Sequence, residues 1–396
     1  MAGGAQNLAR HDVLRKQAGA LPVVNVVATS VIPLHEPDTA MTSARQRTAD
    51  FCTRYGLELP ILLAPMAGAS AVSLSVAVAN AGGSGACGAL LMSPAEIRAW
   101  AEEFRAQSKR PFQINLWMPD PPPARDRAHE ARVRAFLADF GPEVPDSAGD
   151  APLQDFAAQC AALLDVAPPI VSSVMGLFPD EWVRRYRERG LRWFATVTTV
   201  DEARQAEAAG ADVIVAQGME AGGHRGSFDA AAAERRLVGL FALLPAVVDA
   251  VKLPVVATGG IADARGVAAA LTLGASAVQI GTGFLRAPEA KLHPAWAKAL
   301  AETLPEQTVL TRAFSGRAGR GIATRYVLAA SDPAAPAPAP YPVQRGLSAA
   351  MRAHAQKAGD IDRMQAWAGQ SAAMAQAGPA AEITRGLWQS AQALLP

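Results

Sequence analysis

Residues 254–283 read PVVATGGIADARGVAAALTLGASAVQIGTG, and they carry the clearest folding pattern in the chain. An apolar run, 254–258, leads into a glycine pair, and a second run, 277–281, leads into another glycine-containing segment. Between the two runs, Asp263 can cap a helix that ends at Gly274. A helix that joins two strands in this way returns the chain so that the strands pair in parallel. The segment therefore predicts one repeat of an α/β fold.

The same alternation extends outward in both directions from residue 60 onward. Helices with clear end signals separate the apolar runs: Ser93-Pro94-Ala95-Glu96 forms a capping box with proline in the first turn, and Thr199 opens a second box whose helix stops at Gly210. The runs are rich in Val, Ile and Ala without clean alternation, which is typical of parallel strands buried on both faces. The eight expected strands are 61–65, 84–88, 111–116, 169–174, 192–197, 212–217, 254–258 and 277–281.

Eight strands with intervening helices predict an α/β fold of the (βα)8 TIM-barrel class. An open doubly wound sheet is the alternative, but no G-x-G-x-x-G motif opens the first βα turn, which counts against it. The barrel is expected over residues 41–286, with an insertion at about 117–165 after the third strand. Residues 287–396 are expected to form a mainly helical accessory region, in which the proline-rich segment 333–342 favours a stiff, extended linker.

The composition excludes several classes of protein. Among the 396 residues, 50% are hydrophobic and 18% charged, so a large core can form and general disorder is excluded. The net charge of +1 gives no indication of a nucleic-acid or acidic-lipid partner. Three widely spaced cysteines, Cys52, Cys87 and Cys160, exclude a disulfide scaffold and a thiolate zinc site. We expect no metal, and a reducing, cytoplasmic environment.

Two segments could be mistaken for membrane or export signals. No charged residue occurs between Glu58 and Glu96, but prolines and glycines break this stretch, so buried strands and a helix explain it better than a transmembrane helix. Residues 1–40 contain an apolar stretch that loosely resembles a signal peptide, interrupted by Pro22 and Pro33. We expect residues 1–40 to be a disordered extension instead.

Candidate site residues follow the strands, because active sites of TIM barrels lie at the carboxyl ends of the strands. Gly259 and Gly260 follow the seventh strand, and Gln279-Ile280-Gly281-Thr282 lies at the end of the eighth. Glycines at these positions leave backbone N–H groups free to approach an anion, and this end of the barrel is the usual phosphate site of the fold. The alternative is that the glycines only serve tight turns. We expect a phosphate-bearing ligand.

The exit of the sixth strand, Gln217 to Gly226, contains the most informative histidine. His224 follows Gly222 and Gly223, where we expect it to face the ligand, free of core packing. The other five histidines lie in tails, surface-like helices or connections.

Three further segments at the same end describe the shape of the ligand. Backbone at Ala64, Pro65 and Met66 can lie against a flat ring, while the side-chain amides of Asn115 and Gln217 suit the polar edge of a heterocycle. Flavin mononucleotide (FMN) is planar, polar along one edge and phosphorylated, whereas a sugar phosphate meets only the last condition.

These segments closely resemble the nitronate monooxygenases, formerly called 2-nitropropane dioxygenases. The resemblance runs from about Thr42 to the C-terminus and rests on Ala64-Pro-Met-Ala-Gly, Gln217-Gly-Met-Glu-Ala-Gly-Gly-His-Arg-Gly, Gly259-Gly-Ile-Ala-Asp, Val278-Gln-Ile-Gly-Thr, Phe314-Ser-Gly-Arg and Trp367-Ala-Gly-Gln. The Ala-Gly-Gly-His segment is shared with flavin-dependent enoyl-acyl-carrier-protein reductases and NADH:quinone reductases. Gln217 together with His-Arg-Gly-Ser-Phe is more similar to the nitronate branch.

The resemblance implies a non-covalent FMN enzyme that oxidises alkyl nitronates with O₂ to a carbonyl compound and nitrite, without a nicotinamide cofactor. Nitroalkanes are an alternative substrate that stays open. His224 is implied as the catalytic residue. The implied FMN contacts are Ala64, Pro65, Met66, Asn115, Gln217, Gly222, Gly223, Gly259, Gly260, Gln279, Ile280, Gly281 and Thr282. The implied partners are the small-molecule substrate and O₂, with a homo-oligomer as an open alternative.

The chain departs from the best-known bacterial branch at three positions. Val174 stands where that branch has a second histidine, and Arg345 and Ala349 follow Tyr341 where that branch has tyrosine and lysine. Flavin contacts are untouched, but the substrate is put in question. Three hypotheses therefore stay open: an FMN-dependent nitronate monooxygenase, an FMN-dependent NAD(P)H:quinone or enoyl-thioester reductase, and a non-flavin phosphate-binding barrel.

Overall fold

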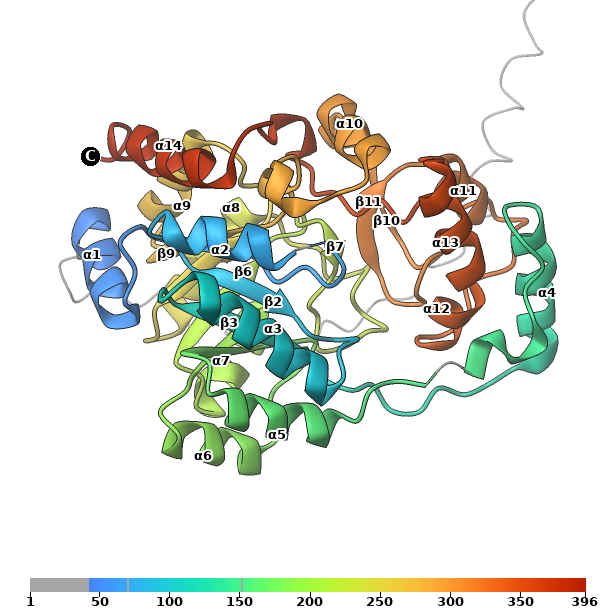
Figure 1. Cartoon of the computed structure of the whole chain (residues 1–396), viewed down its shortest axis with the longest axis horizontal. Coiled ribbons are helices and arrows are strands. Elements are labelled where there is room, and N and C mark those ends of the chain that lie inside the picture. Colours follow the sequence, from blue (N-terminus) through green and yellow to red (C-terminus); the bar gives the residue numbers. More distant parts are fainter. Residues whose placement is uncertain (1–42, 70, 151) are drawn as a thin grey trace, which may run out of the picture. The chain divides into compact units, whose positions relative to one another are not determined.

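Eight parallel strands form a barrel with helices around it (Figure 1). A computed structural model describes residues 43–69, 71–150 and 152–396. Around the barrel the strands follow the order β1-β9-β8-β6-β5-β4-β3-β2, and a parallel bridge between Leu62 and Ser84 joins the two ends of the sheet. The strands are β1 (Ile61–Leu63), β2 (Gly85–Gly88), β3 (Phe112–Trp117), β4 (Ile170–Val174), β5 (Arg192–Val197), β6 (Val213–Gln217), β8 (Val255–Thr258) and β9 (Ala277–Ile280). All eight strands expected from the sequence, and the TIM-barrel class, are confirmed.

The helices begin and end where the local sequence supplies caps. Ser93 and Glu96 form the expected capping box at the start of α3, and Asp263 accepts a hydrogen bond from Gly266 N at the start of α9. Gly210 adopts φ +90° after α7, as the stop signal requires. The helices up to the end of the barrel are α1 (Ala44–Tyr55), α2 (Val72–Asn80), α3 (Pro94–Gln107), α4 (Arg127–Ala138), α5 (Phe156–Val166), α6 (Asp180–Glu188), α7 (Val200–Ala208), α8 (Leu240–Ala250) and α9 (Ala264–Thr272).

The amino-terminal end of the barrel is closed by α1. Phe51 and Tyr55 of this helix pack against Phe194 of β5, with ring centroids 6.3 and 5.1 Å away. These side chains join the apolar residues that fill the barrel interior, among them Leu62 and Val215. One end of the barrel is therefore packed solid, and any ligand site must lie at the other end.

The region after the barrel contains strands as well as helices. It contains α10 (Pro294–Glu302), α11 (Arg325–Ala330), α12 (Val343–Leu347), α13 (Ala349–Ala358) and α14 (Ala380–Gln392). It also contributes β10 (Thr308–Thr311) and β11 (Gly319–Ile322), which form an antiparallel sheet with β7 (Gly223–His224) of the barrel. The expectation of a mainly helical accessory region missed this sheet: β10 and β11 are only four residues long, and β11 pairs with β7 across about 95 residues of sequence, so no local signal marks that pairing.

The insertion and the C-terminal region pack on each other. Figure 1 shows α4 of the insertion beside α12 and α13, and Val133 and Leu137 of α4 share a core with Leu347 and Met351. The proline-rich segment 333–342 is part of this layer and not a free linker: Ala339 and Tyr341 are buried, and Ala339 N donates to Gln344 Oε1.

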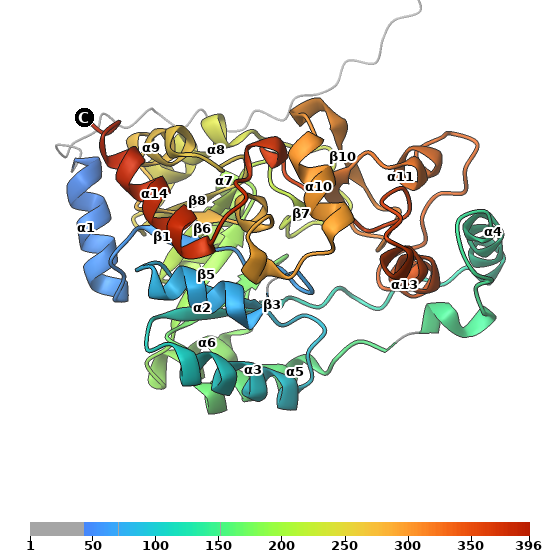
Figure 2. The same ribbon diagram turned by 45° about the horizontal axis from the view of Figure 1, so that its top comes forward.

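The C-terminal helix returns to the barrel. Figure 2 shows α14 alongside α9 and α2, where its Ile383 and Leu387 join the main core. Residues 43–396 form a single compact unit. The expected extension 1–40 lies outside the described residues. Within the described part of the chain, no helix has both the length and the apolar character needed to cross a bilayer.

Candidate functional site

A cavity of about 550 Å³ lies at the carboxyl ends of the barrel strands, between the barrel and the C-terminal region. Every site residue expected from the sequence lines it, with the exception of Ile280: Ala64, Pro65, Met66, Asn115, Gln217, Gly222, Gly223, His224, Gly259, Gly260, Gln279, Gly281 and Thr282. The volume lies in the range of roughly 300–1,000 Å³ found for small-molecule and cofactor sites.

Ile280 does not face the cavity. Its side chain is buried in the core between the sheet and the helices, whereas that of the preceding Gln279 lines the cavity. Alternation along the strand explains the difference, because successive side chains of a strand point to opposite faces. Only the backbone of Ile280 is near the site, and its carbonyl accepts a hydrogen bond from Ala64 N.

Glycines form one wall of the cavity. Gly259 and Gly260 adopt φ values of +107° and +70°, which residues with a side chain rarely adopt. Gly222 lies directly against the segment at Gly369: a Cβ added to Gly222 would lie 2.5 Å from Gly369 N. These positions require glycine, and they leave backbone N–H groups accessible to an anionic group of a ligand.

Amide side chains lie on the barrel side. Asn115 Nδ2 donates to Ser172 Oγ at 3.1 Å, and Gln279 Oε1 accepts from Gln113 Nε2 at 2.9 Å, inside the barrel. Gln217 holds the loop that carries the histidine: its Oε1 accepts from Gly226 N at 2.8 Å and its Nε2 donates to the His224 carbonyl at 3.2 Å. Gln217 therefore positions the loop in addition to facing the cavity.

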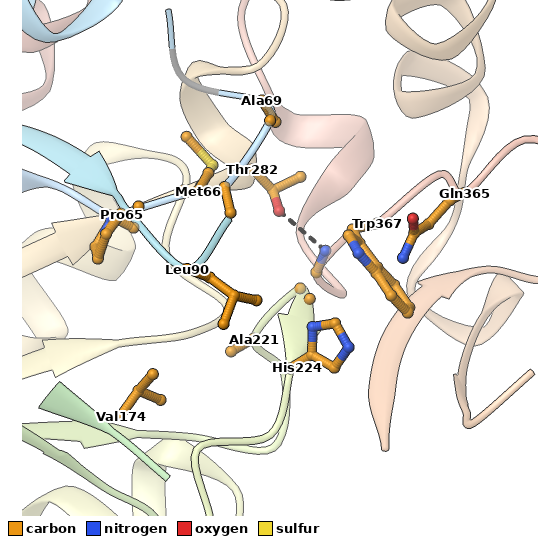
Figure 3. Close-up of a pocket in the computed structure, with 18 of the residues that line it drawn as sticks. Pro65, Met66, Ala69, Leu90, Val174, Ala221, His224, Thr282, Gln365 and Trp367 are labelled. Carbon is orange, nitrogen blue, oxygen red and sulfur yellow. Dashed lines mark hydrogen bonds between the residues drawn. The ribbon is translucent and has the colours of Figure 1, made fainter. Parts of the chain in front are cut away.

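His224 lies at the margin of the cavity between Ala221 and Trp367 (Figure 3). The expectation that it is free of packing is wrong. Its backbone pairs with Gly319 of β11, and its ring lies between Trp117 and Trp367, with ring centroids 4.7 and 4.9 Å away. Nε2 lies 2.8 Å from Ser315 Oγ. The imidazole is thus held in place by two indoles and a hydroxyl.

This environment keeps His224 neutral. Burial, together with the positive charges of Arg317 and Arg352, lowers the pKa of His224 from 6.5 to about 3. A buried imidazole near cations loses affinity for a proton because both effects disfavour its charged form. At neutral pH one ring nitrogen therefore carries a proton and the other is an acceptor.

The C-terminal region makes part of the cavity wall cationic. Arg345 and Arg352 are the charged residues that line the cavity, and no carboxylate lines it among the described residues. Arg352 donates hydrogen bonds to three neutral oxygens, which are Ser348 Oγ, Gln365 Oε1 and the backbone carbonyl of Arg345. The Arg345 side chain makes no hydrogen bond or ion pair with any described residue. An anion can therefore balance both charges.

The positions at which the chain departs from the best-known branch of nitronate monooxygenases all face the cavity. Val174, Arg345 and Ala349 line it, as does Tyr341, whose buried hydroxyl has no hydrogen-bond partner among the described residues. The departures therefore change the cavity wall itself and leave the glycine wall intact.

Several lining residues were not expected from the sequence. Trp117 lies two positions after Asn115 on β3, so strand alternation places both on one face and could have identified it. Arg352, Gln365 and Trp296 come from the C-terminal region, where no sequence pattern ties them to the barrel. No cluster of His, Cys, Asp and Glu able to hold a metal ion occurs among the described residues.

Comparisons with known proteins identify the family of the chain. The family model of nitronate monooxygenase matches residues 51–390. Nitronate monooxygenases from Paraburkholderia phytofirmans and Pseudomonas aeruginosa are 40% and 39% identical, over 83% and 86% of this chain and 91% and 98% of theirs. The crystal structure of nitroalkane oxidase from Streptomyces ansochromogenes superposes with a TM-score of 0.79 at 36% identity, covering 86% of this chain and 98% of that one. FabK from Thermotoga maritima gives a TM-score of 0.69 at 28% identity, over 87% of this chain and 96% of its own. The chain belongs to the nitronate monooxygenase family.

Proposed function

We propose that this protein is an FMN-dependent nitronate monooxygenase that oxidises alkyl nitronates with O₂ to a carbonyl compound and nitrite. One observation carries the proposal: His224 lines a cavity that is also lined by glycines from the barrel loops and by two arginines without carboxylate partners. An alkyl nitronate is a small anion, and such a cavity attracts it. Membership of the nitronate monooxygenase family supports the same reaction.

The residues present fit FMN. Its phosphate suits the wall formed by Gly259, Gly260 and Gly281, which carry no Cβ, and by the neighbouring Thr282. No described carboxylate lines the cavity to repel the phosphate. Its ring suits the flat backbone from Ala64 to Met66, with amide side chains of the barrel strands toward its polar edge. When bound, FMN supplies the electron-accepting chemistry that amino-acid side chains lack.

The side chains of this chain hold and orient the substrate. Arg345 and Arg352 offer charged donors to the nitronate oxygens, and charge-assisted hydrogen bonds of this kind are roughly twice as strong as neutral ones. Trp117 and Trp367 cover the imidazole and exclude water from the reacting atoms. His224, neutral at physiological pH, is available to take a proton from a nitroalkane.

The expected setting is the reducing cytoplasm, with the nitronate and O₂ as small-molecule partners. All three cysteines are free and buried, and burial raises the pKa of Cys52 and Cys87 to about 11 and 12, so these thiols stay protonated and unreactive.

Turnover measurements test the proposed function. Purified holoenzyme given a preformed alkyl nitronate in air should consume O₂ and release nitrite, and heating the protein should release FMN. Protein that binds no flavin on reconstitution would overturn both flavin hypotheses. Flavin-loaded protein that oxidises NADH with a quinone or reduces an enoyl thioester, but ignores the nitronate, would establish the reductase alternative.

A further inference from the structure

The two ring nitrogens of His224 have different surroundings. Nε2 lies 2.8 Å from the Ser315 hydroxyl, which belongs to the loop before β11. Nδ1 has no hydrogen-bond partner among the residues that the structure describes, and His224 lines the cavity. Because the neutral imidazole carries one proton, the Ser315 contact decides which nitrogen is left as an acceptor.

The hydrogen bonds of Ser315 determine which nitrogen of His224 carries the proton. Its Oγ accepts from Arg317 N at 3.3 Å and donates to the Arg317 carbonyl at 3.2 Å. A hydroxyl has one proton and two lone pairs. When the Ser315 hydroxyl donates its proton to the Arg317 carbonyl, its two lone pairs accept hydrogen bonds from Arg317 N and from a protonated His224 Nε2. In the opposite arrangement, Oγ donates to Nε2, the carbonyl loses this donor, and a proton on Nδ1 finds no described acceptor. The first arrangement satisfies more buried polar groups and is favoured.

The hydroxyl is held firmly enough to impose this choice. The next residue, Gly316, adopts φ +88°, and a Cβ there would lie 2.4 Å from Tyr341 N. On the other side, Ser348 Oγ donates to the Phe314 carbonyl at 2.6 Å. The loop that carries Ser315 is therefore fixed on both sides, and the two indoles fix the imidazole.

We propose that Ser315 is a positioning residue that keeps the proton of neutral His224 on Nε2, so that Nδ1 receives the α-proton of a nitroalkane. The inference rests on the proposed function and extends it to neutral substrates. In this step the α-C–H bond breaks, its electron pair moves into the nitro group to give the nitronate, and the proton forms the N–H bond at Nδ1. The resulting imidazolium still donates through Nε2 to Ser315, and it returns the proton to solvent after oxidation.

Nitrogen NMR of the holoenzyme tests the tautomer without any turnover. In protein labelled with ¹⁵N in its histidines, His224 should show a protonated Nε2 and an unprotonated Nδ1 at about pH 7. The His224 signals are assigned by their loss in His224→Asn. Ser315→Thr, which keeps the hydroxyl, should retain this pattern, and Ser315→Ala should lose the single tautomer. Hydrogen on Nδ1 in the unaltered protein would overturn the proposal, whatever the enzyme oxidises.

Kinetics test the consequence for the reaction. Ser315→Ala should lower kcat/KM about tenfold for a neutral nitroalkane, the order of one neutral hydrogen bond, and leave a preformed nitronate almost unaffected. Ser315→Thr should restore most of the loss. The matched control is Thr311→Val, which removes a buried hydroxyl at the start of the same loop, where it accepts only from Ala313 N and does not line the cavity. An equal loss for both substrates, or an equal loss in the control, would show that Ser315 only supports packing. Failure to oxidise any nitronate would refute the proposed function and leave the NMR result standing.

Discussion

Replacing Gly222 with alanine tests how the glycine wall holds its ligand. An added Cβ would lie 2.5 Å from Gly369 N, 2.7 Å from the Ala368 carbonyl carbon and 2.8 Å from Thr282 Oγ1, whereas ordinary contact begins at 3.4 Å. Two of these three atoms belong to the backbone and cannot rotate away. The segment at 368–369 must therefore move, and with it the hydrogen bond from Gly369 N to Thr282 Oγ1, now 3.0 Å long.

The cost follows from these contacts. Overpacking a filled site costs about 1–3 kcal/mol, and a lost neutral hydrogen bond costs about 0.5–1.5 kcal/mol. For the compact unit 43–396 these costs correspond to a fall in Tm of about 2–6 °C. Flavin occupancy should fall as well, because Thr282 loses the bond that orients it at the cavity wall.

Two measurements check this expectation. The ratio of heat-released flavin to protein reports occupancy, and a thermal melt reports Tm. Gly386→Ala is the matched control, because an added Cβ there meets nothing within 4 Å in α14. Gly386→Ala should keep the flavin occupancy and the Tm of the unaltered protein. If Gly222→Ala also kept wild-type flavin and Tm, the contact between the loop at Gly222 and the segment at Gly369 would not support the ligand site.

Three further predictions concern the chemistry. His224→Asn should keep bound flavin, shown by its absorbance spectrum, and lose about 10²–10⁴-fold in kcat/KM for a neutral nitroalkane, with a smaller loss for a preformed nitronate; no loss for either would remove His224 from the reaction. Because the pKa of His224 is lowered to about 3, falling pH removes no base, so kcat/KM for the nitroalkane should stay level down to about pH 5; an acid limb near 6.5 would contradict this. Arg352→Gln should raise KM for the nitronate about tenfold or more, as expected for a lost charge-assisted hydrogen bond, whereas Lys357→Gln on the exposed side of α13 should not; equal effects would indicate only a change in net charge.

Much of the fold could be predicted from local sequence. The apolar runs and their caps identified all eight barrel strands, because buried parallel strands and helix starts have short-range signatures, as at Ser93 and Asp263. The sheet of β7, β10 and β11 was missed, since Gly223–His224 is too short for a periodic pattern and its partner lies far along the chain.

The site residues, too, could be predicted only in part. Glycines and polar residues that directly follow strands were found, because the barrel fixes where strand ends meet. Ile280 was misplaced by neglecting alternation within β9. The surroundings of His224 could not be predicted, because Trp117, Ser315 and Trp367 reach it from three segments whose meeting depends on the packing of the insertion and the C-terminal region.

Anaerobic mixing of the flavin-loaded enzyme with a preformed alkyl nitronate, and separately with NADH, tests the central proposal most directly. Flavin absorbance is recorded after each addition in the absence of O₂. The proposed function predicts that the nitronate bleaches the oxidised flavin spectrum and that NADH leaves it unchanged. Bleaching by NADH, with the nitronate inert, would contradict the proposal and identify the protein as a reductase.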